Sequence, residues 1–306
     1  MQRGDILGLQ EMEPDEIRTI LDQAHAFKEI LSRRIKKVPT LRGQSICTLF
    51  YEPSTRTRAS FELAAKIMSA DAINVASSSS SVVKGESLKD TVLTLEAMGI
   101  DLLVIRHSMA GAPAFAAQVA RIPVINAGDG LHEHPTQGLL DLFTMRDVKG
   151  RLEGLKVAIV GDIAHSRVAR SAIHLLSKLG SKITLCGPPE LLPEITTTLA
   201  PGLRITRSCE DAVRGADVVM VLRVQKERLA GLQVSLADYV TRYQMTMARL
   251  RLAKNDAMFM HPGPIIRGLE LTWEVADCPQ SVIVEEVKNG VPLRMAVLAR
   301  ALGKAS

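Results

Sequence analysis

One stretch is central to the fold of this chain: Phe50-Tyr51-Glu52-Pro53-Ser54-Thr55-Arg56-Thr57-Arg58-Ala59-Ser60-Phe61-Glu62. The apolar run 45–50 predicts a buried strand, and Pro53 ends it. Ser54 is then a favourable N-cap for a helix. The next apolar residues recur at the spacing of one helical face: Phe61, Ala64, Ala65 and Met68. The stretch therefore predicts a strand that leads directly into a helix.

The first turn of this expected helix carries groups that bind anions. Ser54, Thr55 and Thr57 supply hydroxyls, and Arg56 supplies a guanidinium. The backbone N–H groups at a helix N-terminus lack intrahelical partners, and the macrodipole is positive there. Arginine can bind phosphate through two hydrogen bonds. We therefore favour a phosphate site over the alternative, an ordinary capped helix with solvated arginines.

Bulk composition limits the class of protein. The 306 residues suffice for one large domain or two ordinary ones, and the net charge of +5 does not require a nucleic-acid partner. Four isolated cysteines form no CxxC pair, which predicts neither a zinc site nor a redox motif. We expect a cytoplasmic protein without a membrane partner, because the chain shows no signal-peptide pattern and no apolar run of about 20 residues.

Strand and helix patterns alternate along the chain. Further strands are expected at 72–75, 101–106, 123–127, 155–162, 183–186, 217–223 and 257–261. Helices are expected at 12–31, 88–98, 113–120, 136–146 and 287–302. This alternation predicts an α/β fold of two domains, each a mainly parallel sheet flanked by helices and joined by inter-domain helices. Arg106 and Arg223 end two of the strands, where side chains commonly face a ligand crevice.

Residues elsewhere in the chain suggest two other kinds of site, one for a metal ion and one for a dinucleotide. His132 and His134 flank Glu133, which raises a metal site, but the HExxH spacing and a second ligand cluster are absent. The strand that ends at Gly161-Asp162 suggests a dinucleotide fold, but GxGxxG does not follow it. We therefore expect no metal and no cofactor.

Six motifs in order along the chain resemble the aspartate and ornithine carbamoyltransferases. They are Ser54-Thr55-Arg56-Thr57-Arg58, Lys84-Gly85-Glu86-Ser87, His134-Pro135-Thr136-Gln137, Gly161-Asp162-Ile163, Leu222-Arg223-Val224-Gln225 and His261-Pro262-Gly263-Pro264. The resemblance covers nearly the whole chain. One departure is Ile266, where family members commonly carry Asn. The resemblance implies a carbamoyl-phosphate-binding domain (1–135 plus 286–306), an aspartate-binding domain (150–285) and a linking helix (136–149).

The same resemblance assigns roles to individual residues. Carbamoyl phosphate would be bound by Ser54, Thr55, Arg56, Thr57, Arg106, His134, Gln137 and the carbonyls of Gly263 and Pro264. The catalytic group among these would be Arg56, Thr57, Arg106 and His134. Aspartate would be bound by Lys84, Arg167, Arg223 and Gln225. In the family a neighbouring subunit's loop completes the site. Here that loop would supply Lys84, which would also bind the phosphate, and either Ser80 or Ser81.

The resemblance implies transfer of a carbamoyl group to the α-amine of aspartate in pyrimidine biosynthesis, by a homotrimer with shared active sites. A regulatory chain or another pathway enzyme as partner stays open. Ornithine or another amino acid is the close alternative, but ornithine enzymes carry His-Cys-Leu-Pro where this chain has His261-Pro262-Gly263-Pro264. A non-catalytic scaffold subunit is a further alternative, although such proteins usually lose the arginine or the lysine that Arg56 and Lys84 match here.

Overall fold

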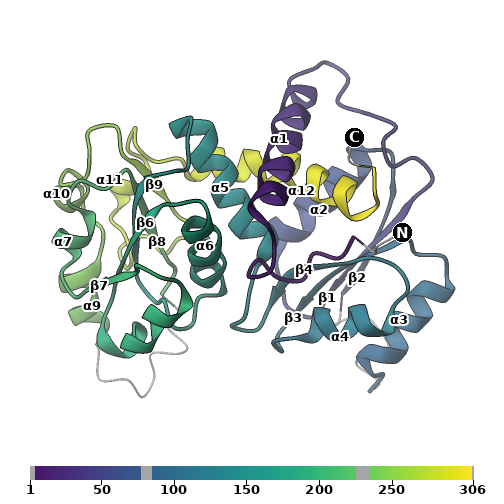
Figure 1. Ribbon diagram of the computed structural model, residues 1–306, viewed down its shortest axis with the longest axis horizontal. Helices are drawn as coiled ribbons and strands as arrows, with labels where there is room; N and C mark the ends of the chain where they lie inside the picture. The colour runs from purple at the N-terminus through teal and green to yellow at the C-terminus, as the bar shows by residue number, and fades with distance from the viewer. Residues whose placement is uncertain (1–3, 77–84, 225–234, 305–306) are drawn as a thin grey trace. The chain divides into compact units, whose positions relative to one another are not determined.

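The computed structural model describes residues 4–76, 85–224 and 235–304, which form two compact units (Figure 1). The first unit comprises the chain up to Phe143 and from Val287 onward, and the second comprises Thr144–Glu286. The chain passes between the units within two helices, α5 (Pro135–Lys149) and α12 (Ile283–Ala301). Each unit contains one parallel sheet flanked by helices, which confirms the expected fold class.

The sheet of the first unit has four parallel strands in the order β2-β1-β3-β4. The strands are β1 (Ser45–Phe50), β2 (Asp71–Ala76), β3 (Leu102–His107) and β4 (Val124–Asp129). The helices of this unit, besides the parts of α5 and α12 that belong to it, are α1 (Pro14–Leu31), α2 (Thr55–Ile67), α3 (Leu88–Ala97) and α4 (Ala112–Val119). Parallel strands need crossover connections, and helices provide them here.

Alternating side chains of the first sheet point to opposite faces. Cys47 and Leu49 of β1 pack with Leu103 and Ile105 of β3 against α3 and α4. The helices α1, α2 and α12 lie on the other side of this sheet (Figure 1). Both faces are therefore covered, which explains why the strands read as continuous apolar runs.

The sheet of the second unit has five parallel strands in the order β7-β6-β5-β8-β9. They are β5 (Lys156–Val160), β6 (Lys182–Cys186), β7 (Arg204–Thr206), β8 (Val218–Val221) and β9 (Met258–Met260). The α-helices within this unit are α6 (Arg167–Lys178), α7 (Cys209–Val213), α9 (Leu236–Tyr243), α10 (Met247–Leu250) and α11 (Trp273–Ala276). Two short 3-10 helices, η3 (Pro189–Leu191) and η4 (Glu194–Leu199), follow β6.

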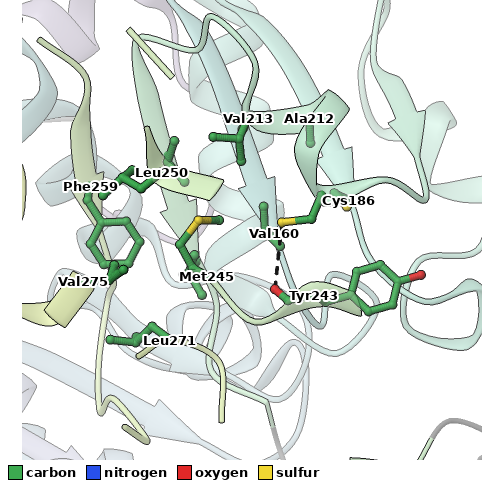
Figure 2. Packing of buried hydrophobic residues seen from close by; sticks show 14 of the residues in the cluster. Val160, Cys186, Ala212, Val213, Tyr243, Met245, Leu250, Phe259, Leu271 and Val275 are labelled. Carbon is green, nitrogen blue, oxygen red and sulfur yellow. Dashed lines mark hydrogen bonds between the residues drawn. The ribbon is translucent and has the colours of Figure 1, made fainter. Parts of the chain in front are cut away.

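One face of this second sheet builds a core with the short helices. Val160 of β5 and Phe259 of β9 pack with Val213, Tyr243 and Leu250 (Figure 2). The Sγ of Cys209 also lies 4.0 Å from the Tyr243 carbonyl oxygen, within this core. Few aromatic residues are needed, because small and branched aliphatic side chains fill the space between strands and helices.

The structure corrects several local expectations. Gly128 and Asp129, which lie beyond the expected strand 123–127, are the last residues of β4. Helix α12 begins at Ile283, four residues before the expected start, and α5 extends to Lys149. The strand β7 and the helices α7, α9, α10 and α11 carry short patterns that were not predicted. Over the part of the chain that the structure describes, no helix has the length and apolar character needed to cross a bilayer.

Candidate active site

The carboxyl edge of the first sheet brings together residues that are distant in sequence. Phe50, the last residue of β1, pairs with Arg106 of the neighbouring strand β3. The backbone N–H of Tyr51 donates to the Arg106 carbonyl oxygen at 2.8 Å. Helix α2 starts at Thr55, four residues after Tyr51. The first turn of α2 is therefore anchored beside the end of the strand that carries Arg106.

The N-terminus of α2 differs from a self-capped helix end. Ser54 occupies the N-cap with extended backbone, as predicted, but its side chain makes no capping hydrogen bond. Ser87 and Ser166, by contrast, accept a bond from the third helical N–H of α3 and α6. Thr57 is buried, whereas Arg56 is exposed. The hydroxyl of Ser54 is thus not used to satisfy the N–H groups of its own helix, which suits an external anion.

The guanidinium of Arg106 is held by groups of its own unit. Nη1 donates to the Ala127 carbonyl oxygen at 3.1 Å, and Nε lies 3.4 Å from Oε2 of Glu52. Only 14% of the Arg106 side chain is exposed. These contacts restrict the guanidinium to one orientation, so it can act as a preorganised donor toward a developing negative charge.

An aromatic contact joins the ends of β1 and β3. The rings of Tyr51 and His107 lie 4.5 Å apart between centroids. Nδ1 of His107 accepts from the Met109 backbone N–H at 2.9 Å. Burial lowers the pKa of His107, although the carboxylates of Glu52 and Asp129 act in the opposite direction. His107 is therefore kept neutral to lower pH than an exposed histidine.

His134 and Gln137 stand at the start of α5, after β4. Both side chains are buried, and Gln137 Nε2 donates to Asp141 Oδ1 at 2.8 Å. The loop before α5 is tied to the sheet, because the Gly130 N–H donates to the His107 carbonyl oxygen at 2.9 Å. The sheet thus places the start of α5 at the same edge as Arg106. The buried carboxylate of Asp141 is a component of this site that the motifs did not reveal.

His132 does not belong to this group. Its Nδ1 lies 3.1 Å from Oδ2 of Asp129, and about half of the side chain is exposed. Across residues 4–76, 85–224 and 235–304, no cluster of three or more His, Cys, Asp or Glu side chains could hold a metal ion.

The second unit places two of the expected aspartate ligands at the carboxyl edge of its own sheet. Arg167 opens α6, whose N-cap Ser166 accepts from the Ala169 N–H at 3.1 Å. Arg223 follows β8, the strand beside β5. The Leu222 N–H donates to the Val160 carbonyl oxygen at 2.9 Å, which joins the ends of these strands. Both arginines are partly buried and lie beyond adjacent strand ends, where an anionic ligand can reach them.

The turn after β9 is held by a buried pair of side chains. Gly263 N–H donates to His261 Nδ1 at 2.9 Å, and His261 Nε2 lies 3.3 Å from Glu270 Oε1. The Ile266 N–H donates to the same carboxylate oxygen at 2.5 Å. The Gly263–Pro264 peptide bond is cis. The Ile266 side chain, which replaces the usual Asn, packs against the core of the second unit.

The predicted site residues therefore fall into three groups. The first unit contains Ser54, Thr55, Arg56, Thr57, Arg106, His134 and Gln137, and the second contains Arg167, Arg223, Gly263 and Pro264. Ser80, Ser81, Lys84 and Gln225 lie outside the described residues. A cavity of about 430 Å³ also lies in the first unit, but Leu7, Glu11, Asp129 and other residues that are not predicted ligands line it.

Comparisons with known proteins identify the family. The family description "Aspartate/ornithine carbamoyltransferase, carbamoyl-P binding domain" matches residues 4–147, and the description of its Asp/Orn binding domain matches residues 153–301. The chain belongs to the aspartate/ornithine carbamoyltransferase family.

Relatives named for aspartate are similar over the full length. The aspartate carbamoyltransferase catalytic subunit of Solibacter usitatus is 55% identical over 298 residues, which are 97% of this chain and 99% of the relative. The subunit of that name from Moorella thermoacetica is 52% identical over 307 residues and covers 100% of this chain and 99% of its own.

Solved structures of both branches share the fold. Ornithine carbamoyltransferase from Pyrococcus furiosus has a TM-score of 0.88 at 29% identity and covers 98% of this chain and 97% of its own. Aspartate transcarbamoylase from Trypanosoma cruzi, in complex with carbamoyl phosphate and aspartate, has a TM-score of 0.83 at 31% identity and covers 96% of this chain and 95% of its own. The fold is thus common to both branches and does not by itself select the amino-acid substrate.

Proposed function

We propose that this protein transfers the carbamoyl group of carbamoyl phosphate to the α-amine of L-aspartate, giving N-carbamoyl-L-aspartate and phosphate. The observation that carries the proposal is the carboxyl edge of the first sheet. There Arg106 is held by the Ala127 carbonyl oxygen beside the start of α2, whose N-cap serine makes no capping bond. A rigid guanidinium next to a helix N-terminus suits an acyl phosphate, which carries a phosphate group and a polar carbonyl.

In this proposal the residues of the first unit bind carbamoyl phosphate. Ser54, Thr55, Arg56 and Thr57 bind the phosphate. Thr57, Arg106 and His134 donate to the carbamoyl oxygen, and Gln137 accepts from the carbamoyl amide. The domain limits inferred from sequence, 1–135 plus 286–306 for carbamoyl phosphate and 150–285 for the amino acid, with 136–149 as link, are part of the proposal.

The second unit would bind the amino acid. Arg167 and Arg223 pair with the two carboxylates of aspartate, with Gln225 and Lys84 as further ligands. The carbonyls of Gly263 and Pro264 accept hydrogen bonds from the carbamoyl amide. Support comes from the two arginines beyond adjacent strand ends and from the full-length relatives named for aspartate.

Catalysis would rest on positioning and electrostatic stabilisation. Carbamoyl phosphate is already activated, so a covalent enzyme intermediate is not required. The neutral α-amine attacks the carbamoyl carbon, and the negative charge that develops on the carbonyl oxygen is stabilised by Thr57, Arg106 and His134. The C–O bond to phosphate then breaks, and phosphate leaves with the proton lost by the amine.

We also propose a cytoplasmic homotrimer in which a neighbour's loop, with Lys84 and either Ser80 or Ser81, completes each site. The location is supported by the four cysteines, all of which are free thiols, as expected in a reducing compartment. The reaction would contribute to pyrimidine biosynthesis, in line with the names of the relatives. A regulatory chain or a pathway-enzyme partner is also part of the proposal.

The test is carbamoylation of aspartate and ornithine, measured side by side with purified protein and carbamoyl phosphate. We expect carbamoyl-aspartate and phosphate in equal amounts, with no product from ornithine. Product from ornithine alone would overturn the roles of Arg167 and Arg223 but keep the phosphate site. No product from either amino acid would favour a non-catalytic subunit.

A further inference from the structure

The side chain of Gln137, which we propose binds the substrate, is hydrogen-bonded to a buried carboxylate. Gln137 and Asp141 are four residues apart on α5, so their side chains lie on the same face of the helix. Gln137 Nε2 donates to Asp141 Oδ1 at 2.8 Å. Asp141 is fully buried and Gln137 is 8% exposed, so bulk water hardly competes for this bond. The contact is therefore well placed to hold the Gln137 side chain in one conformation.

The chemistry of the partner determines which way the amide points. A glutamine amide has a donor end and an acceptor end of nearly the same shape. An ionised carboxylate accepts hydrogen bonds and donates none. In the structure the NH₂ end of Gln137 faces Asp141, and Oε1 is the end directed away from that carboxylate. With two lone pairs, Oε1 can accept a hydrogen bond from a ligand.

We propose that Asp141 is a positioning residue that holds Gln137 Oε1 as an acceptor for the carbamoyl NH₂ and so selects carbamoyl phosphate over acyl phosphates without an N–H donor. This inference rests on the proposed function. Acetyl phosphate is the informative competitor, because a methyl group replaces the amide and offers no hydrogen bond. A site that presents an acceptor there favours the ligand that can donate to it.

The substitution Asp141→Asn tests this role with little change in volume. An asparagine can donate as well as accept, so a flipped Gln137 would be paired equally well. Flipped Gln137 would direct its NH₂ group at the NH₂ group of the substrate, two donors facing each other. Discrimination between the phosphates should then be lost, although phosphate binding itself is untouched.

The experiment compares the wild type, Asp141→Asn, Gln137→Ala and the double variant. It measures kcat/KM for carbamoyl phosphate and the inhibition constant of acetyl phosphate. We expect Asp141→Asn to lower kcat/KM about 10- to 100-fold, the range for loss of a hydrogen bond that involves a charged or buried group. The inhibition constant of acetyl phosphate should change by less than about threefold. In the Gln137→Ala background the Asp141→Asn change should add almost nothing, because Asp141 acts through Gln137.

The control is Asp147→Asn, the same change at an exposed residue of α5, which should leave both constants as in the wild type. Equal weakening of both phosphates by Asp141→Asn would indicate a structural role and overturn the proposal. Additive losses in the double variant, or wild-type behaviour of Asp141→Asn in an active enzyme, would also overturn it. A wild-type protein that binds no carbamoyl phosphate in calorimetry would overturn the proposed function itself.

Discussion

His261 and Glu270 are both fully buried, and His261 Nε2 lies 3.3 Å from Glu270 Oε1. Nδ1 of the same ring accepts from the Gly263 N–H, so Nε2 is the ring nitrogen that faces Glu270, although it makes no hydrogen bond there. Glu270 also accepts from the Ile266 N–H. The pair therefore links both sides of the turn that contains Gly263 and Pro264, and it orients the carbonyls proposed to bind the carbamoyl amide.

Glu270→Ala should disturb this turn. The Ile266 N–H would lose its buried acceptor, which costs about 1–3 kcal/mol of unfolding free energy. The KM for carbamoyl phosphate should rise. Glu270→Gln keeps one acceptor oxygen, so its KM and its unfolding free energy should lie between those of the wild type and of Glu270→Ala. Denaturant unfolding and steady-state kinetics check this. The exposed Glu274 provides the control Glu274→Ala, and equal effects of the two alanine variants would contradict the role of Glu270.

Removal of a donor from the carbamoyl-phosphate site should slow the chemical step. His134→Ala should lower kcat by about 10²–10³, the usual effect of losing one oxyanion donor, and Arg56→Ala should lower it on the same scale because it removes a charged donor to the leaving phosphate. Kinetics at saturating aspartate would measure the change. Arg58→Ala, on the exposed side of the same helix α2, should keep kcat near the wild-type value. Wild-type turnover in either test variant would show that its residue was assigned wrongly.

The two arginines of the second unit should act on the amino acid and not on carbamoyl phosphate. Arg167→Ala and Arg223→Ala should each lower kcat/KM for aspartate by about 10- to 100-fold, because a charged hydrogen bond to a carboxylate is lost. Calorimetric binding of carbamoyl phosphate should stay unchanged. Arg204→Ala, an exposed arginine in β7, is the matched control. A loss of carbamoyl-phosphate binding in the test variants would argue against a role specific to aspartate.

His107 should make the protein less stable in mild acid. Its pKa in the folded protein is lowered from the ordinary 6.5, mainly by burial, so the unfolded chain takes up the proton first. The free energy of unfolding should therefore fall as pH decreases through about 6.5. His107→Phe keeps a ring beside Tyr51 and removes the titration, so its stability should depend less on pH. Denaturant unfolding of both proteins between pH 8 and 5 measures how the free energy of unfolding changes with pH. Equal changes in the two proteins would show that His107 is not the cause.

The four thiols should differ in reactivity. Cys47, Cys186 and Cys209 are fully buried, and burial raises the pKa of Cys47 to about 12. Cys278 is only partly buried. In the native protein a thiol-specific disulfide reagent should therefore modify Cys278 alone, whereas all four thiols should react in denaturant. The Cys278→Ser variant should show no rapid reaction, and a rapid reaction in that variant would mean that a buried thiol becomes exposed.

Local patterns predicted the long elements of this fold well. The apolar runs that became β1, β3, β5 and β8 and the periodic residues of α1 and α2 all stand out because buried strands and amphipathic helices leave strong local signals. Short elements such as β7 and α10 did not, because three or four residues are too few to show a period. The side chain of Ser54 also departed from expectation, since an N-cap residue type does not guarantee a capping bond.

By itself the sequence determined the α/β class, the order of the strands along the chain and the residue types of the motifs, since these depend on local periodicity and composition. The tertiary structure decided which strands are neighbours and which side chains support the motif residues. The contacts of Arg106 with Ala127, of His261 with Glu270 and of Gln137 with the buried Asp141 depend on strand register and burial. Such contacts arise only when the whole sheet packs, because residues distant in sequence then exclude water from a common site.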